Sequence, residues 1–261
     1  MAIIQSLRSA GYNPYFYDID GLRPSFEEVE RFFSARKPDV LGISAVVSTA
    51  YSYAKRLVSM VKLVSPKTRI ILGGNLAASA EICHRFAGID YCVSGEGEVV
   101  IINLMNYLSD RLDSDCSGDD FEKLKSVRGI SFIDPSGHLQ FTGYEPALPA
   151  AVLVDPDYGI LEEFSRIKNY ICDPGDRADF MLDPRSSEPH RKGIKMATVI
   201  SAKGCVARCT FCHRWDKGYR ALPVAGIVGR IRYLKEKHNV GFIAFGDENF
   251  GSDRRQVDEL I

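Results

Sequence analysis

Three cysteines within eight residues form the strongest chemical signal in this chain. They stand at Cys205, Cys209 and Cys212, a C-x3-C-x2-C spacing, and we call residues 205–212 the cysteine loop. Three thiolates on one loop can bind three irons of a cubane iron–sulfur cluster and leave the fourth iron open. Structural zinc normally takes four protein ligands, so a zinc site would need His213 or the distant Cys172 as well. Three unrelated buried cysteines are the remaining interpretation.

The composition around this motif is that of an ordinary globular chain. The 261 residues are 45% hydrophobic and 26% charged, with a formal net charge of -1. No apolar stretch reaches the roughly 18–20 residues that would cross a bilayer, and the N-terminus lacks the features of a signal peptide. The seven cysteines do not form the dense framework of a secreted disulfide-rich domain. We therefore expect a cytoplasmic protein with no membrane span.

Basic residues concentrate around the cysteine loop although the whole chain is nearly neutral. Residues 185–237 contain thirteen lysines or arginines and three acidic residues. Such a run is commonly a solvated face that is balanced by acids nearby in space, and it is equally compatible with a site for an anionic ligand.

The first 110 residues alternate helix-like and strand-like segments with short connections, which is typical of a parallel sheet covered by helices. A helix is predicted over residues 2–10, and a capping box at Ser25–Glu28 opens another. Each predicted strand is a short, mostly apolar run, and the four runs lie at residues 15–19, 40–43, 70–72 and 90–93.

The second half of the chain is predicted to begin with a hairpin over residues 129–142 and a proline-rich linker over 143–192. Beyond the linker, the pattern predicts a strand at 196–200, a loop through Tyr219, a helix from Val224 and a strand at 242–245. The sequence therefore predicts two domains, over residues 1–142 and 193–261, joined by the linker.

The cysteine loop, with the aromatic Phe211 directly before its last cysteine, resembles the cluster-binding motif of the radical S-adenosylmethionine enzymes. Members of that family place the loop after the first strand of a partial α/β barrel, and barrel sites lie at the C-terminal ends of strands. In the family, the open iron binds S-adenosylmethionine, and the reduced cluster cleaves it to a 5'-deoxyadenosyl radical. The resemblance implies a 4Fe-4S cluster held by Cys205, Cys209 and Cys212.

Two further segments match this resemblance. The segment that begins at Gly246 resembles the acidic segment that helps to hold the ammonium group of S-adenosylmethionine, although strand-end acids also commonly cap the following helix. Tyr219-Arg220 resembles a Tyr-Arg pair found downstream of the cysteines, so Arg220 either contacts a cofactor carboxylate or lies on a solvated face. The implied S-adenosylmethionine-binding residues are Phe211, Arg220, Gly246, Asp247 and Glu248.

Glycine turns follow the strands predicted in the N-terminal half, where backbone amides can approach a ligand. Glycine there also simply permits a turn, and a nucleotide-binding or receiver-like domain would show similar turns. Together with the cysteine loop, the order of these landmarks resembles the cobalamin-binding domain that precedes the barrel in cobalamin-dependent radical enzymes. The implied cobalamin-binding residues are Ser44, Gly73, Gly74, Asn75, Gly95, Glu96 and Gly97.

The resemblance implies an α/β fold in which a Rossmann-like (flavodoxin-like) cobalamin-binding domain, expected to lack its first strand, precedes the start of a partial (β/α)6 radical S-adenosylmethionine barrel. The implied function is that of a cobalamin-dependent methyltransferase acting on an unactivated carbon through the 5'-deoxyadenosyl radical. Its partners would be a small-molecule substrate and an electron donor such as a flavodoxin or ferredoxin, rather than nucleic acid. We expect the chain to be an internal fragment that is inactive alone, with no catalytic residue assignable beyond the cluster ligands.

Two alternatives stay open. The same cofactors could serve ring formation or rearrangement without methyl transfer. From another class, a non-catalytic iron–sulfur or zinc module could bind nucleic acid through the basic residues around the cysteine loop.

Overall fold

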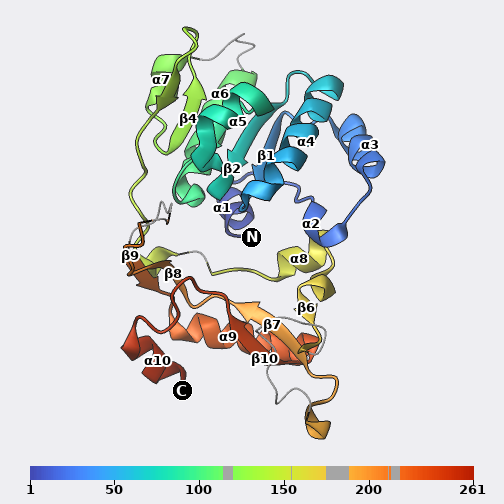
Figure 1. The fold of residues 1–261 in the computed structure, drawn as a ribbon, viewed down its shortest axis with the longest axis vertical. Helices are drawn as coiled ribbons and strands as arrows, with labels where there is room; N and C mark the ends of the chain where they lie inside the picture. Colours follow the sequence, from blue (N-terminus) through green and yellow to red (C-terminus); the bar gives the residue numbers. More distant parts are fainter. Residues whose placement is uncertain (114–119, 154, 175–187, 211, 213–217) are drawn as a thin grey trace.

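The structure of the chain, a computed structural model, describes residues 1–113, 120–153, 155–174, 188–210, 212 and 218–261. Figure 1 shows the first sheet with its helices apart from the smaller sheets of the C-terminal half, and a long connecting segment runs between them. The first sheet has five strands in the order β1-β2-β3-β4-β5; a three-stranded sheet, β10-β7-β6, and a two-stranded ribbon, β8-β9, follow. Within the described ranges, no helix is long and apolar enough to cross a membrane.

The first sheet and its helices occupy the N-terminal half. Its strands are β1 (Val40–Ser44), β2 (Arg69–Gly73), β3 (Tyr91–Val93), β4 (Ile130–Ile133) and β5 (Leu139–Phe141). Its helices are α1 (Ala2–Ser9), α2 (Ile19–Leu22), α3 (Phe26–Arg36), α4 (Tyr51–Val64), α5 (Ala80–Ala87), α6 (Gly97–Asp113) and α7 (Phe121–Lys125). Strands β1, β2 and β3 are parallel, and the hairpin β4-β5 adds antiparallel to β3.

Helices cover both faces of this sheet because successive strand residues point to opposite sides. Ile70 and Leu72 of β2 are buried in a core with residues of α3, α4 and α5. Ile71, between them, is buried in a second core with residues of α1, α6 and α7. Burying one such side chain contributes about 1.5–3 kcal/mol, so the two cores hold the sheet as the middle of three layers.

Most predicted elements of this half are confirmed. The capping box at the start of α3 forms in both directions, since the Glu28 N–H donates to Ser25 Oγ (3.2 Å) and the Ser25 N–H donates to Glu28 Oε2 (2.7 Å). The hairpin predicted over residues 129–142 is β4-β5, in which Asp134 accepts hydrogen bonds from the N–H groups of Ser136 and His138.

The strand predicted at residues 15–19 is wrong. Its aromatic side chains pack outside the sheet, where the ring of Tyr17 stacks on Phe32 of α3 with centroids 4.2 Å apart. Asp18 then accepts a hydrogen bond from the Gly21 N–H and caps the short helix α2. The apolar side chains of this run therefore pack against helices rather than in a strand.

The C-terminal half is built on one β-α-β unit. Its elements are β6 (Ile171–Cys172), β7 (Lys195–Val199), β8 (Ala202–Cys205), β9 (Gly218–Ala221), α9 (Val224–His238), β10 (Val240–Phe245) and α10 (Arg254–Leu260). Strands β7 and β10 are parallel, and α9 packs on them through the buried Ile227 and Leu234. The loop predicted through Tyr219 is wrong in part, because β8 and β9 pair as an antiparallel ribbon. The described residues form open sheets and no closed barrel.

The segment predicted as a linker contacts both halves. It contains α8 (Gly159–Phe164), and Tyr170 donates a hydrogen bond to the buried Asp18 (2.6 Å). On the other side, Glu162 of α8 pairs with Lys237 of α9 at 2.5 Å. Short 3-10 turns also occur at Ser48–Ala50, Asn75–Ser79, Ala150–Val152, Ile167–Asn169 and Pro189–Arg191. The division into two domains stays a prediction.

Candidate functional site

The carboxyl ends of β1, β2 and β3 form one edge of the first sheet, which we call the ligand edge together with the turns that follow. Ser44 and Gly73 are paired at the ends of β1 and β2. The next residues, Gly74 and Asn75, are exposed. The structure thus brings together the cobalamin-binding residues predicted after the first two strands.

The turn after β2 depends on glycine. Gly74 has φ +85°, and a Cβ atom at this position would lie 2.4 Å from the carbonyl oxygen of Ala45. That close approach lets the Ala45 carbonyl accept a hydrogen bond from the Leu76 N–H at 3.1 Å. The two turns of the ligand edge are therefore fixed to one another by backbone contacts that a side chain would prevent.

The turn after β3 reaches the ribbon β8-β9. Arg220 Nη2 of β9 lies 2.5 Å from Glu96 Oε1, and both side chains are mostly buried, at 13% and 10% exposure. Glu98, 6% exposed, pairs with Lys203 of β8. Burial raises the pKa of Glu96, but hydrogen bonds from Arg220 and the Leu148 N–H, with the nearby charge of Lys203, outweigh it and lower that pKa overall.

Arg220 therefore does not lie on a solvated face. Its Nη1 also donates to the carbonyl oxygen of Leu148 (2.8 Å), whose own N–H donates to Glu96 Oε2 (2.7 Å). Two residues that the sequence assigned to different cofactors, Glu96 and Arg220, are thus partners of each other.

The cysteine loop leaves the end of this ribbon. Cys205, the last residue of β8, is half-buried and pairs in register with Gly218. Cys209 and Cys212 are exposed, and the Cys212 N–H donates to the Cys209 carbonyl at 3.2 Å. Phe211 lies outside the described residues. In the part of the chain that the structure describes, no three Cys, His, Asp or Glu side chains are close enough to hold a metal ion.

The acidic segment after β10 lies against the start of the ribbon. Asp247 Oδ1 accepts hydrogen bonds from the N–H groups of Ser201 (2.7 Å) and Ala202 (3.0 Å), and Oδ2 accepts one from Ser201 Oγ (2.5 Å). The N–H of Gly246 donates to the Val199 carbonyl at 3.0 Å, and Glu248 is exposed. Asp247 therefore fixes the turn between β7 and β8.

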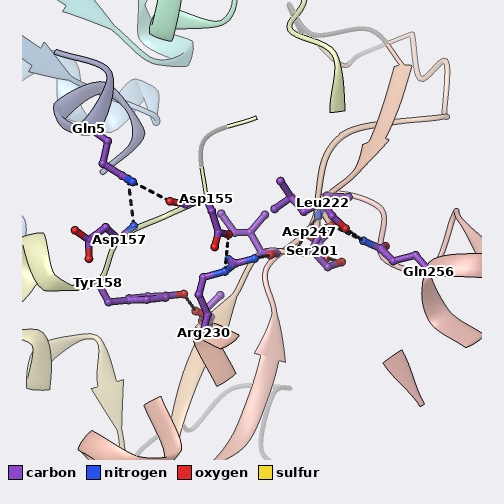
Figure 2. A network of polar contacts seen from close by, with 12 residues as sticks. Gln5, Asp155, Asp157, Tyr158, Ser201, Leu222, Arg230, Asp247 and Gln256 are labelled. Carbon is purple, nitrogen blue, oxygen red and sulfur yellow. Dashed lines mark hydrogen bonds and ion pairs between the residues drawn. The ribbon is translucent and has the colours of Figure 1, made fainter. Parts of the chain in front are cut away.

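A polar network continues from this turn to the first sheet unit (Figure 2). Gln256 Nε2 donates to the carbonyl oxygens of Ser201 and Leu222, at 2.7 and 2.9 Å. The buried Arg230 pairs with Asp155 of the connecting segment (Nε to Oδ1, 2.8 Å). Gln5 of α1 in turn donates to the Asp155 carbonyl (2.8 Å). The Gln256 hydrogen bonds are buried within the second unit, and the exposed Gln5–Asp155 contact links the network to the first unit.

Several of the basic residues in 185–237 pair with acids outside that range. These pairs are Lys195–Asp173, Lys203–Glu98, Arg220–Glu96, Arg230–Asp155 and Lys237–Glu162. Sequence reasoning missed Lys203, Ser201 and Gln256, and only the position of Lys203 two residues before Cys205 could have drawn attention to it.

Comparison with known proteins finds a matching domain model and several distant relatives. The family model of the B12-binding domain matches residues 1–104. The anaerobic magnesium-protoporphyrin IX monomethyl ester cyclase of Cereibacter sphaeroides is 27% identical in an alignment of 262 positions that covers 98% of this chain and 38% of the cyclase. The cytidylyl-2-hydroxyethylphosphonate methyltransferase of Streptomyces wedmorensis is 22% identical over 91% of this chain and 45% of that enzyme. The chain thus spans less than half of these relatives.

Solved structures share the fold over nearly the whole chain. The radical S-adenosylmethionine methyltransferase TsrM from Kitasatospora setae superposes with a TM-score of 0.70 at 16% identity, covering 99% of this chain and 46% of TsrM. The cobalamin-dependent S-adenosylmethionine radical enzyme OxsB gives a TM-score of 0.68 at 18% identity, covering 99% of this chain and 33% of OxsB. The chain therefore contains a B12-binding domain and is a distant homologue, along most of its length, of part of the B12-dependent radical S-adenosylmethionine enzymes.

Proposed function

We propose that this chain is the part of a B12-dependent radical S-adenosylmethionine enzyme that holds cobalamin and an iron–sulfur cluster, and that the enzyme is a methyltransferase acting on an unactivated carbon. One observation carries the proposal. The turn after β3, at the ligand edge of the B12-binding domain, contacts the two strands from which the cysteine loop extends, through Glu96–Arg220 and Glu98–Lys203. A ligand on that edge and a cluster on that loop would therefore be neighbours.

The residues of the ligand edge suit cobalamin. Ser44, Gly74 and Asn75 are exposed there, and a Cβ at Gly73 would meet nothing closer than 4.0 Å, so a ligand can approach the backbone. Val46 and Val47 follow Ser44 with 62% and 57% exposure. Exposed apolar side chains beside an open backbone edge offer a surface for a large, partly apolar ring such as a corrin. Gly95 and Gly97 complete the proposed set, and the predicted cobalamin contact of Glu96 stays a prediction.

The cysteine loop has the three thiols that a cluster needs, but in the described residues these thiols are not arranged around one point. Three thiols on one loop are the ligand chemistry of a cubane with one open iron. Cluster binding would have to draw Cys205, Cys209 and Cys212 together. When bound, the cluster would supply the electron that cleaves S-adenosylmethionine, and cobalamin would carry the methyl group.

Residues of this chain would serve the S-adenosylmethionine site mainly by fixing the backbone of the turns that surround it. Asp247 positions the β7–β8 turn, and Gly246 lets β10 end close to Thr198, because a Cβ at Gly246 would lie 2.6 Å from the Thr198 methyl group. Glu248, exposed beside them, is the acid of this segment best placed to meet an ammonium group. A small-molecule substrate and a flavodoxin or ferredoxin electron donor belong to the same proposal.

Ring formation with the same cofactors is the second candidate, because the relatives at 27% identity are named as cyclases. A full-length enzyme supplied with methyl-labelled S-adenosylmethionine separates the two reactions. Label in the product supports methyl transfer, and unlabelled product contradicts it.

Anaerobic reconstitution of the chain with iron and sulfide tests the cluster itself. We expect a cluster absorbance with about four irons per chain, which Cys209→Ala largely abolishes. Cys172→Ala is the matched control, since Cys172 is a half-buried cysteine outside the loop, and it should leave the iron content unchanged. Bound zinc without iron would contradict the proposal and support a non-catalytic module.

A further inference from the structure

We infer that Glu96 and Glu98 form a clamp that positions the ribbon β8-β9, and with it the base of the cysteine loop, against the ligand edge of the first sheet. The clamp comprises these two acids with Arg220 and Lys203. Its catalytic meaning rests on the proposed function, whereas its existence rests on the contacts between the two units.

The two cations of the clamp lie directly opposite each other in the ribbon. Lys203 of β8 and Arg220 of β9 are partners in the antiparallel register. Like charges opposite each other on one face of a strand pair destabilise it, and an isolated two-stranded ribbon is only marginally stable. The ribbon therefore needs both cations to be neutralised from outside.

The turn after β3 and the start of α6 supply the two acids. Glu96 forms an ion pair with Arg220, and Glu98 forms one with Lys203. The side chains of the two acids are 10% and 6% exposed. Glu98 also lies in the first turn of α6, where the helix dipole favours a carboxylate. The acids are thus held in place by the first unit, and the ribbon is paired correctly only when it lies against them.

The clamp fixes where the cysteine loop begins. The last pair of the ribbon joins Cys205 to Gly218, two residues along β8 from Lys203. Since the acids follow β3 directly, the distance between the first cluster cysteine and the ligand edge is set by the clamp. Glu96, Glu98, Lys203 and Arg220 are therefore positioning residues, and Glu96 and Arg220 act in this role as each other's partner.

Hydrogen–deuterium exchange of the cofactor-free chain, followed by mass spectrometry, tests the clamp. In the double variant Glu96→Gln/Glu98→Gln we expect exchange in residues 202–205 and 218–221 to rise about tenfold or more, because local opening of the ribbon becomes easier. Exchange in β1 and β2 should stay unchanged. The matched control is Glu163→Gln, which removes an ion pair between α1 and α8 of the connecting segment (Arg8–Glu163, 2.9 Å) without touching the ribbon, and which should leave ribbon exchange unchanged.

A rescue variant separates the clamp from a general contribution to stability. Adding Lys203→Met to the double variant removes one of the two opposed cations, so ribbon exchange should slow again. Ribbon exchange within about twofold of the wild type, or equal acceleration in every strand of the chain, would overturn the inference. If the double variant unfolds, the single variant Glu96→Gln is measured in its place against the same two outcomes. Because no cofactor is present, failure of the clamp leaves the proposed function standing, and failure to bind iron leaves the clamp standing.

Discussion

Asp247 offers the sharpest test of how the second unit is held, because its carboxylate accepts three hydrogen bonds from two residues. Ser201 is fully buried and Ala202 is 5% exposed, so Asp247→Ala leaves their N–H groups without the acceptor at 2.7 and 3.0 Å. A hydrogen bond to a charged group contributes about 1.5–3 kcal/mol. Asp247 is half-buried, so water can take over part of the hydrogen bonding in the variant. We therefore expect Asp247→Ala to lower the free energy of unfolding by about 3 kcal/mol.

A loss of that size lowers the melting temperature by about 6–12 °C, at roughly 2–4 °C per kcal/mol for a chain of this length. Asp247→Asn keeps one acceptor oxygen and should cost about half as much. Thermal unfolding followed by circular dichroism measures both variants. The control is Asp258→Ala on the exposed face of α10, which should shift the transition by about 1 °C or less. If Asp247→Ala melts within about 2 °C of the wild type, the carboxylate does not fix the β7–β8 turn.

Two further predictions address the ligand edge and the connecting segment. Gly74→Ala should weaken hydroxocobalamin binding, measured by absorbance titration, by about tenfold or more, because its Cβ meets the Ala45 carbonyl at 2.4 Å; Gly11→Ala, with a similar φ of +86° and open space, should bind normally. Hydrogen bonds from Lys237, then Tyr233 and His238, lower the pKa of Glu162 to about 2 from its usual 4.5. Ionised Glu162 therefore stabilises the fold above pH 4.5, and Glu162→Gln should lower the melting temperature there by an amount that vanishes as the pH falls towards 2. Equal affinities for the two alanine variants, or a pH-independent Glu162→Gln effect, would contradict these arguments.

The elements that could be predicted from the sequence are those marked by a local pattern, such as an apolar run or a capping box. Strands β1 and β2 are apolar runs between polar turns, and the start of α3 carries its own capping box, so local pattern was sufficient. Residues 15–19 show the limit of that pattern, because Tyr17 satisfies it by stacking on Phe32 of a helix. A short apolar run predicts burial, and it does not identify the element against which the side chains are buried.

The cysteine loop could be found because its ligands lie within eight residues of each other. The clamp could not be found from the sequence, because Lys203 and Glu98 are 105 positions apart and meet only through the packing of two units. For the same reason Arg220 left two interpretations open from the sequence, and the structure shows it mostly buried beside Glu96. Residues defined by local spacing were predicted, and residues defined by long-range pairing were not.

The most direct test of the central proposal is the metal content of one sample. The chain is reconstituted anaerobically with iron, sulfide and hydroxocobalamin, and gel filtration removes unbound cofactor. Its metal content is then measured by inductively coupled plasma mass spectrometry. We predict about one cobalt and about four irons per chain, with both cofactors on the same molecule. Cobalt without iron, or zinc in place of iron, would contradict the account.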